Sequence, residues 1–316
     1  MRAVAQWTVA GLQEQVDLCN DMGEGLELLP LVCDGATLGG IVKALAEELV
    51  GDGNGAFVFG DSDDGDNSHG GAVLLHPRLR EASFEDRNAA VAATCDSLRE
   101  RGVVTGWRDE LVAVVPSYDA DPAFLVERAA YPLLGCKGYG VHVNGYVEDG
   151  GGGGGEESLR LWIGTRAATK QTYPRLLDHI AAGQQPFGIS PGENVVKECG
   201  EEAGVPEAIA RGAKPASAIS YRGVYGEGKG ERVTNDVIMC YDIVLPANFT
   251  PTPVDGEIEK FELMGVDDVL DRICAGAFKP NVALVTIDFL VRHGALTPEL
   301  PGYLKLVGSL RQGSCS

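Results

Sequence analysis

The sequence predicts a protein of the α/β (α+β) class that is built in two parts. Short apolar runs bounded by glycine, which are typical of strands, alternate with longer segments whose apolar residues recur at helical spacing. The chain has 316 residues, which is more than one hydrophobic core usually organises. Because the pattern changes near 135–138, we predict one domain over 1–137 and a second over 138–316.

The first part is predicted to begin with sheet and to continue with helix. Asp34 and Gly35 indicate a turn between two short strands. Ser83 caps a helix of about five turns that ends at Gly102. Pro122 suits the first turn of a further helix. The predicted elements are strands within 31–42, 55–60 and 71–77, a helix at 83–102, a strand at 110–115 and a helix at 122–134.

The second part is predicted to contain longer strands and more helices. Six consecutive glycines at 150–155 lie between two strands that should pair, so we interpret them as a hairpin connection. The predicted elements are strands at 138–147, 158–167, 217–224 and 235–244, and helices at 191–203, 266–275, 281–293 and 297–310.

Composition and charge narrow the classes of partner. Hydrophobic residues make up 44% and charged residues 23%, close to globular averages, which excludes wholesale disorder. No stretch approaches the roughly 20 apolar residues that span a bilayer, so we expect no membrane partner. The net charge of -20 would repel a nucleic acid polymer. A small anionic substrate fits this charge if a metal ion or a local Arg and Lys cluster reverses the field.

The cysteines and the first residues bear on the compartment. Eight cysteines are spread over the chain without a C-x-x-C pair, which fits neither a zinc site nor a compact disulfide framework. The start, MRAVAQWTVAGLQEQ, lacks a Leu-rich core and is unlike a secretory signal. We therefore expect a reducing, cytoplasmic location and leave an organellar one open. The sequence gives no indication of the oligomeric state.

Two loops match ion- or phosphate-binding motifs only in part. In DSDDGD (61–66), Asp66 stands where an EF-hand needs Gly, and Ala72 stands where it needs Glu. In the P-loop-like stretch 223–229, the following Gly230 replaces the Ser or Thr that would ligate magnesium. We interpret both as turns between strands.

A third match, G-x-S-x-G at 188–192, resembles the nucleophile elbow of α/β-hydrolases. Ser190 is followed by Pro191 and, three positions on, by Glu193, which is the pattern of a capping box with Pro at the first helical position. The Ser190 hydroxyl is therefore predicted to cap a helix rather than to act as a nucleophile.

The capped helix carries an acidic face. Glu198, Glu201 and Glu202 stand three and four residues apart, so they share one face while apolar residues occupy another. Like charges at these spacings cost a helix about 0.2 to 0.5 kcal/mol per pair, and a divalent cation would relieve that cost. The alternative is a solvated acidic face.

The context of this helix resembles a known family. Between 183 and 205 the sequence is similar to the Nudix box, with Ile189 in place of a Glu and Lys197 in place of an Arg. From about 107 to 303 it resembles the thiamine pyrophosphokinase-related Nudix branch, through segments such as GWRDELVAVV, YGVHVNGYV and NVVKECGEEAGVP. The residues in register with the box are Gly183, Glu198, Cys199, Glu201, Glu202, Gly204 and Val205.

The resemblance implies a fold, a cofactor and a site. The fold would be a Nudix α/β/α sandwich with a mixed sheet, preceded by a smaller α+β domain of the DUF4743 type. The cofactor would be Mg²⁺, with Mn²⁺ as a substitute, because the ion neutralises a diphosphate and activates water. The implied metal ligands are Glu198, Glu201, Glu202 and the Gly183 carbonyl; the catalytic candidates are Glu201, Glu202, Glu257 and Glu259; the substrate-binding candidates are Arg166, Lys170 and Lys197.

Several of these assignments have alternatives. Glu257 and Glu259 are candidates for the general base, but acidic residues also keep an edge strand soluble. His142 and His179 are expected to be polar core residues. Aromatic residues that would stack on a substrate ring, or pack in the core, are Trp107, Tyr139, Tyr173 and Phe187.

The resemblance implies thiamine diphosphate or its oxidised oxy and oxo analogues as substrate, cleaved to the monophosphate and phosphate. One alternative is 8-oxo-dGDP or another nucleoside diphosphate derivative. An alternative of another class is a non-catalytic regulatory domain that binds a diphosphate, which the two departures from the box permit. Isopentenyl diphosphate isomerase chemistry would need a Cys and Glu pair that we do not find in the sequence.

Overall fold

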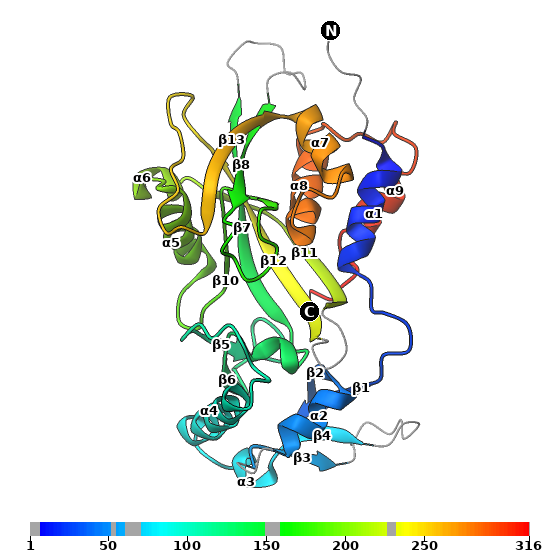
Figure 1. Ribbon diagram of the computed structural model, residues 1–316, viewed down its shortest axis with the longest axis vertical. Helices are drawn as coiled ribbons and strands as arrows, with labels where there is room; N and C mark the ends of the chain where they lie inside the picture. The colour runs from blue at the N-terminus through cyan, green and yellow to red at the C-terminus, as the bar shows by residue number, and fades with distance from the viewer. Residues whose placement is uncertain (1–6, 52–54, 61–70, 149–158, 226–231, 316) are drawn as a thin grey trace.

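A computed structural model of the chain describes residues 7–51, 55–60, 71–148, 159–225 and 232–315. These residues form two parts that lie one above the other in Figure 1, each built on its own sheet. The acidic loop 61–66, the glycine run 150–155 and the loop residues 226–231 lie outside the described residues. The α/β class and the helix-covered mixed sheet predicted from the sequence are confirmed.

The first part contains a four-stranded sheet in the order β2-β1-β4-β3. The predicted turn joins its first two strands, and both Asp34 and Gly35 adopt positive φ there. Ser83 caps α4 as predicted, since its hydroxyl accepts the N–H of Asp86 at 3.1 Å. The elements are β1 (Leu28–Cys33), β2 (Ala36–Val42), α2 (Lys43–Val50), β3 (Phe57–Gly60), β4 (Ala72–Leu75), α3 (Pro77–Arg80) and α4 (Phe84–Glu100).

The predicted helix at 122–134 is wrong. The segment forms strand β6 (Phe124–Glu127), which pairs antiparallel with β5 (Leu111–Val114), and then a 3-10 helix, η1 (Tyr131–Leu133). Phe124 and Val126 alternate into the core of the first part, so pairing with β5 outweighs the local helical pattern.

The second part is organised by a mixed sheet in the order β11-β12-β7-β8-β13. The central strand β7 runs parallel to β12 along its length. On its other side β7 pairs first with β10 and then with β8, so the sheet splits where these two strands diverge. The strands are β7 (Gly138–Glu148), β8 (Leu159–Arg166), β9 (Leu177–Asp178), β10 (Ala181–Gln184), β11 (Lys214–Tyr225), β12 (Arg232–Val244) and β13 (Ile258–Gly265).

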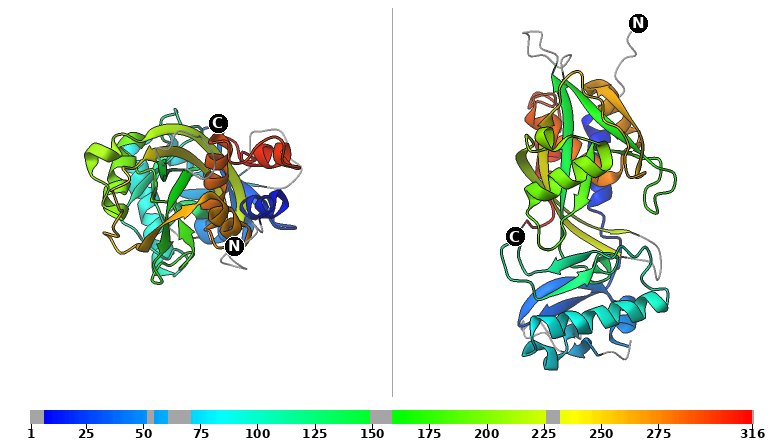
Figure 2. Two further views of the ribbon diagram at one scale, coloured as in Figure 1. Left: turned by 90° about the horizontal axis from the view of Figure 1, so that it is seen from above. Right: turned by 90° about the vertical axis from the view of Figure 1, so that its left-hand side faces the viewer.

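Helices cover both faces of this sheet, as Figures 1 and 2 show. One face packs against α5 through Val141, Val143 and Val195, and the other packs against α8 through a separate apolar core. The last helix is shorter than predicted because Pro301 and Gly302, at a φ of 91°, precede it. The helices are α5 (Pro191–Ala203), α6 (Glu207–Ala210), α7 (Val266–Cys274), α8 (Pro280–Arg292) and α9 (Tyr303–Ser309).

Two elements connect the parts across the predicted boundary. Helix α1 (Val9–Cys19), near the start of the chain, packs Leu12 and Val16 into the core beside α8. The β11–β12 pair reaches the other way and buries Val233 in the core of the first part. By packing, therefore, α1 joins the second part although it precedes residue 137.

Within the first part, the backbone after β6 also approaches strand β2 closely. Gly135 lies so near Gly40 that a Cβ atom at 135 would stand 2.0 Å from the Gly40 carbonyl oxygen. This contact sets where the residues after β6 lie relative to β2. Among the described residues, no helix has both the length and the apolar character that a membrane crossing requires.

Candidate active site

Helix α5 presents the acidic residues, and its first turn is fixed by the predicted capping box. The Ser190 hydroxyl accepts the Glu193 N–H at 3.3 Å, and the Ser190 N–H donates to the Glu193 carboxylate at 2.8 Å. The helix ends at Gly204, whose φ of 62° suits a glycine cap. The Ser190 hydroxyl is thus engaged with its own helix, which confirms the cap.

Glu202 is the most deeply placed carboxylate of this helix, with 7% of its surface exposed. It accepts one hydrogen bond, from the Ala182 N–H at 3.1 Å. Burial raises the pKa of Glu202 well above its ordinary value of 4.5, and the charges of Asp178 and Glu198 raise it further. No lysine or arginine among the described residues pairs with it, so this carboxylate is buried without a counter-charge.

Glu198 lies over Gly183, one turn before Glu202. A Cβ atom at position 183 would stand 2.2 Å from Glu198 Oε1, so glycine is required there for space and not for an unusual φ. Burial raises the pKa of Glu198, although the Lys197 ammonium opposes that rise. The predicted pair of Gly183 and Glu198 is therefore brought into contact, with Gly183 on β10 and Glu198 on α5.

Lys197 acts as a counter-ion for the outer part of the acidic face. Its Nζ atom lies 3.0 Å from Glu198 Oε1 and 3.2 Å from Glu201 Oε2. Glu201 is the most exposed of the three acids, with 56% of its side chain accessible. Lys197, predicted to contact substrate, is thus occupied by two carboxylates of its own helix.

A group of three carboxylates, which we call the acidic triad, gathers beside α5. Oxygen atoms of Glu202, Asp255 and Glu257 all lie within 4.8 Å of one another. Asp255 and Glu257 belong to the loop between β12 and β13, and the Glu257 N–H donates to Asp255 at 2.8 Å. The sequence indicated Glu257 but not Asp255, because an Asp-Gly pair between strands is first of all a turn signal. Glu259 is exposed on β13 and is not part of the triad.

Of the predicted phosphate-binding cations, Lys170 lies at the acidic triad, whereas the side chain of Arg166 is engaged elsewhere. Lys170 forms an ion pair with Glu257. Burial raises the pKa of Glu257, but the Lys170 ammonium outweighs this, so the pKa lies below its ordinary value. All three guanidinium nitrogens of Arg166 are occupied by Asp178 at 2.6 Å and by the carbonyls of Thr172 and Tyr173. Arg166 therefore holds a loop in place, which leaves no open fork for a phosphate.

Two neighbouring cavities share several lining residues, among them Lys279. The smaller, of about 100 Å³, is lined by Gly183, Ala182 and Arg128. The larger, of about 490 Å³, is lined by several tyrosines, and both cavities include Lys279 and Asp236. We call them together the substrate cavity.

Lys279 caps the start of α8 and was not identified from the sequence. Its ammonium group forms no hydrogen bond or ion pair with a described residue. Burial lowers the pKa of Lys279, while the charges of Asp178 and Glu202 oppose that change. The segment FKPNVAL offered no signal beyond the proline at the first helical position, so only the fold shows that this lysine lines the cavity beside Gly183.

The two histidines are buried, as expected of polar core residues. The rings of His142 and His179 pack edge to face with centroids 5.0 Å apart. Burial lowers the pKa of His179 to about 4 and that of His142 well below 6.5. Both rings are therefore neutral near pH 7.

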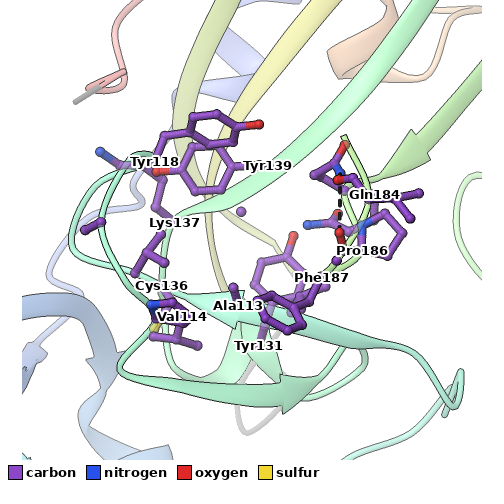
Figure 3. A pocket seen from close by; sticks show the side chains of 18 residues that line it. Ala113, Val114, Tyr118, Tyr131, Cys136, Lys137, Tyr139, Gln184, Pro186 and Phe187 are labelled. Carbon is purple, nitrogen blue, oxygen red and sulfur yellow. Dashed lines mark hydrogen bonds between the residues drawn. The ribbon is translucent and has the colours of Figure 1, made fainter. Parts of the chain in front are cut away.

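The four predicted aromatic residues lie at different places. Tyr139 and Phe187 line a third cavity of about 200 Å³, between the β5–β6 hairpin and the loop before α5, where Tyr118 packs on Tyr139 (Figure 3). Tyr173 lines the substrate cavity. Trp107 is stacked under Arg99 and hydrogen-bonded to Asp109, away from all of these cavities.

Comparison with known proteins identifies relatives for both parts. Residues 11–138 match the family model described as Domain of unknown function (DUF4743). Nudix hydrolase 24, chloroplastic, from Arabidopsis thaliana is 42% identical over 312 residues, which cover 98% of this chain and 80% of that protein. Nudix hydrolase 20, chloroplastic, from the same plant is 42% identical over 310 residues, which cover 98% of this chain and 79% of that protein.

Among solved structures, DR0079 from Deinococcus radiodurans matches with 22% identity and a TM-score of 0.37. The match covers 58% of this chain and 96% of that one.

Proposed function

Because the chain belongs to the Nudix hydrolase family and acts on pyrophosphate bonds, we propose that it hydrolyses a small diphosphate with the help of a divalent metal ion. One observation carries the proposal. In the acidic triad, Glu202 has no cationic partner among the described residues and accepts the N–H of Ala182, which together with Gly183 lines the cavity that includes Lys279.

The residues present fit a divalent cation. Two or more carboxylates that share a buried site are costly to ionise together, and a cation removes that cost. Oxygen ligands are also those that Mg²⁺ prefers. We propose that Glu202, Glu198 and the Gly183 carbonyl hold Mg²⁺, with Asp255 and Glu257 on the facing loop, and that Mn²⁺ can substitute. When bound, such an ion neutralises phosphate charge and lowers the pKa of a bound water.

The chain itself would hold the proton acceptor in place. Glu257 stays ionised because Lys170 lowers its pKa, and the ion pair with Lys170 fixes the carboxylate at the triad. We propose that Glu257 accepts the proton of the attacking water. Glu201, which is exposed and paired with Lys197, tunes the charge of the helix face instead.

Lys279 and Arg128 would receive the diphosphate. Both line the part of the substrate cavity that adjoins Gly183. Arg128 contributes positive charge near Glu198 and is oriented by its ion pair with Glu110 at 2.8 Å. Cations at this position offset the acidic field that a chain with a net charge of -20 otherwise presents to an anion.

For the organic group of the substrate we propose thiamine or its oxidised oxy and oxo forms, released as the monophosphate together with phosphate. A cavity of about 490 Å³ lined by tyrosines supports a small ring substrate. The same metal chemistry would also hydrolyse 8-oxo-dGDP, so the test must distinguish substrates by their organic group.

The test is a panel of diphosphates incubated with the purified protein and Mg²⁺, with products separated by chromatography and released phosphate counted. We expect hydrolysis of thiamine diphosphate or an oxidised analogue, and no hydrolysis after chelation of the metal. A faster reaction with 8-oxo-dGDP would replace the thiamine proposal by the nucleotide one. Binding of a diphosphate without turnover across the whole panel would indicate a regulatory binding domain and overturn the proposal.

The compartment is part of the same proposal. The seven cysteines from Cys19 to Cys274, together with Cys315, are all free thiols in the structure, which suits a reducing environment. Because both plant relatives are named chloroplastic, we propose an organelle of that kind or the cytoplasm. A fluorescent fusion of the full chain distinguishes the two.

A further inference from the structure

The connection between α4 and β5 carries an arginine of the first part, Arg108. We call residues 105–109 of this connection the arginine loop. Its backbone bends on both sides of Arg108, since Gly106 has a φ of 73° and Asp109 has a φ of 57°. The side chain of Trp107 holds the bend, because its Nε1–H donates to the Asp109 carboxylate at 2.9 Å. The loop therefore has a fixed shape around the arginine.

The arginine loop is anchored on both parts of the protein. In the first part, the Arg108 N–H donates to the buried carboxylate of Glu127 on β6 at 2.9 Å. In the second part, the loop touches Gln171, since a Cβ atom at Gly106 would stand 2.5 Å from Gln171 Oε1. Glycine at 106 thus serves both the positive φ and this close approach. Any side chain at this position would push the loop away from the second part.

The segment that the arginine loop touches also holds Glu257. Residues 167–171 follow strand β8, and the Ala167 N–H donates to the Glu257 carbonyl oxygen at 2.9 Å. Lys170, in the same segment, forms the ion pair with the Glu257 carboxylate. The contact at Gln171 therefore brings the arginine loop to the Glu257 side of the acidic triad.

The charge of Arg108 acts on this carboxylate. Burial raises the pKa of Glu257, but the Lys170 ammonium lowers it, and Arg108 lowers it further. The effect of Arg108 is larger than that of Arg166, whose strand pairs with the residue after Glu257. Because such an effect weakens with distance, the guanidinium group lies close to the Glu257 carboxylate.

The guanidinium group of Arg108 is open to a ligand. It forms no hydrogen bond or ion pair with a residue that the structure describes, and its side chain is exposed. Arg166 and Arg128, in contrast, are paired with Asp178 and Glu110. An arginine offers its N–H donors in a planar fork that matches two oxygens of a phosphate. A phosphate is therefore the ligand that this group suits.

We infer that Arg108 binds a phosphate oxygen of the diphosphate at the acidic triad. The inference rests on the proposed function for the identity of the ligand. It gives a role to the segment that matches the domain of unknown function, because Arg108 lies within residues 11–138. The first part of the chain then contributes a substrate-binding residue to a site whose carboxylates all come from the second part.

The experiment measures binding of a diphosphate analogue that is not hydrolysed, so it does not depend on turnover. The probe is methylenediphosphonate, which has two phosphonate groups and no organic ring, and calorimetry with saturating Mg²⁺ gives its Kd. Arg108→Gln removes the charge and the fork, so we expect the Kd to rise by about tenfold. Arg108→Lys keeps the charge without the fork, so we expect a rise of about threefold.

The matched control is Arg101→Gln, which removes the same charge from the first part at a residue that pairs with Glu48 at 2.7 Å. Its Kd should stay within about twofold of the wild type. Gly106→Ala tests the position of the loop. It should raise the Kd in the otherwise wild-type protein by displacing Arg108, and it should add nothing in combination with Arg108→Gln.

A role limited to the pKa of Glu257 predicts a different pattern. Arg108→Gln would then raise that pKa and move the acidic limb of the pH profile of kcat/KM to higher pH, while Arg108→Lys would leave the profile in place. The Kd of the probe would be the same in the wild type and both variants. That equality, or a wild-type protein that does not bind the probe, would overturn the inference.

The proposed function can fail separately from the inference. Probe binding that depends on Arg108, in a protein that hydrolyses no diphosphate, would defeat the proposed function and uphold the inference. Hydrolysis of diphosphates by the wild type, with a Kd for the probe that Arg108→Gln leaves unchanged, would do the reverse.

Discussion

The second sheet carries buried carboxylates at two places, and the two places are built in opposite ways. Asp242 and Asp288, on β12 and α8, are surrounded by cations: Arg292 donates to Asp242 at 3.0 Å and to Asp288 at 2.7 Å. Arg311 adds a second contact to Asp288 at 2.7 Å. The acidic triad has one cation, Lys170, which pairs with Glu257 and not with the buried Glu202.

The pKa values follow this difference. Burial raises the pKa of Asp242, but hydrogen bonds from His293 and Arg292 outweigh it and lower the pKa to about 2. At Glu202 burial and neighbouring carboxylates both raise the pKa. A buried charge that the chain itself neutralises stabilises the fold, whereas one left without a partner marks a place for an external cation.

The largest expected effect comes from removing the charge of Glu202. Glu202→Gln keeps the volume and an oxygen that can accept the Ala182 N–H, but it loses the metal ligand. We expect kcat/KM to fall by about a thousandfold, equivalent to about 4 kcal/mol of transition-state stabilisation. The melting temperature without metal should stay the same or rise, because a buried unpaired charge is removed.

The matched control for Glu202→Gln is Glu207→Gln on α6, which changes an exposed carboxylate that pairs with Arg211. Its rate should remain within about twofold of the wild type. Full activity of Glu202→Gln, or its unfolding in the absence of metal, would contradict the view that Glu202 serves an external cation while Asp242 and Asp288 stabilise the fold.

We call Asp242, Asp288 and Arg292 the compensated cluster. Removing its cation should lower the stability of the fold and leave the activity unchanged. Arg292→Met leaves Asp242 and Asp288 buried with less counter-charge, so we expect the free energy of unfolding to fall by about 3 kcal/mol. The kcat of the folded fraction should hardly change, because this arginine lines neither the triad nor the substrate cavity. Denaturant unfolding with activity measured on the same samples separates the two quantities.

Arg211→Met is the comparison for this variant, since Arg211 pairs with Glu207 on the surface of α6. An exposed pair of this kind contributes about 0.5 kcal/mol or less. Equal losses of stability for Arg292→Met and Arg211→Met would show that burial does not strengthen the Asp242 cluster.

Acid should weaken the compensated cluster over a defined range of pH. The pKa of Asp242 is about 2 in the folded chain against an ordinary value of 3.8, so its ionised form stabilises the fold. That contribution, about 2 kcal/mol, is complete above pH of about 4 and is lost as the pH falls through about 2. Denaturation followed from pH 5 to pH 2 should show a shallower loss in Asp242→Asn than in the wild type.

The sequence predicted the fold of the second part and the acidic helix α5 better than it predicted the rest of the site. The capping box at Ser190 and the triplet Glu198, Glu201 and Glu202 are local patterns on one helix, so spacing alone reveals them. Asp255 reaches Glu202, and Lys279 reaches the cavity beside Gly183, only through the fold of the chain. Nothing near either residue in the sequence distinguishes it.

The failure at 122–134 has the same physical origin. Pro122 and the apolar residues after it suit a helix locally, but β5 lies alongside and takes the segment as a strand. That misassignment hid Tyr131, which sits at the substrate cavity only because the strand ends at Glu127 and the chain turns. Arg166 is the reverse case: its charge makes it conspicuous in the sequence, but in the fold its guanidinium nitrogens donate to Asp178 and to two backbone carbonyls.

The smallest predicted effect concerns Lys279, whose ammonium group has no hydrogen bond or ion pair with a described residue. Lys279→Met removes the charge and keeps the length of the side chain, so it should weaken the attraction of the substrate cavity for a diphosphate. We expect KM to rise by about tenfold, equivalent to about 1.4 kcal/mol, with kcat less affected. Steady-state kinetics at two salt concentrations checks this, because the loss should shrink as salt screens the lysine in the wild type. A fall in kcat at constant KM would instead place Lys279 at the transition state.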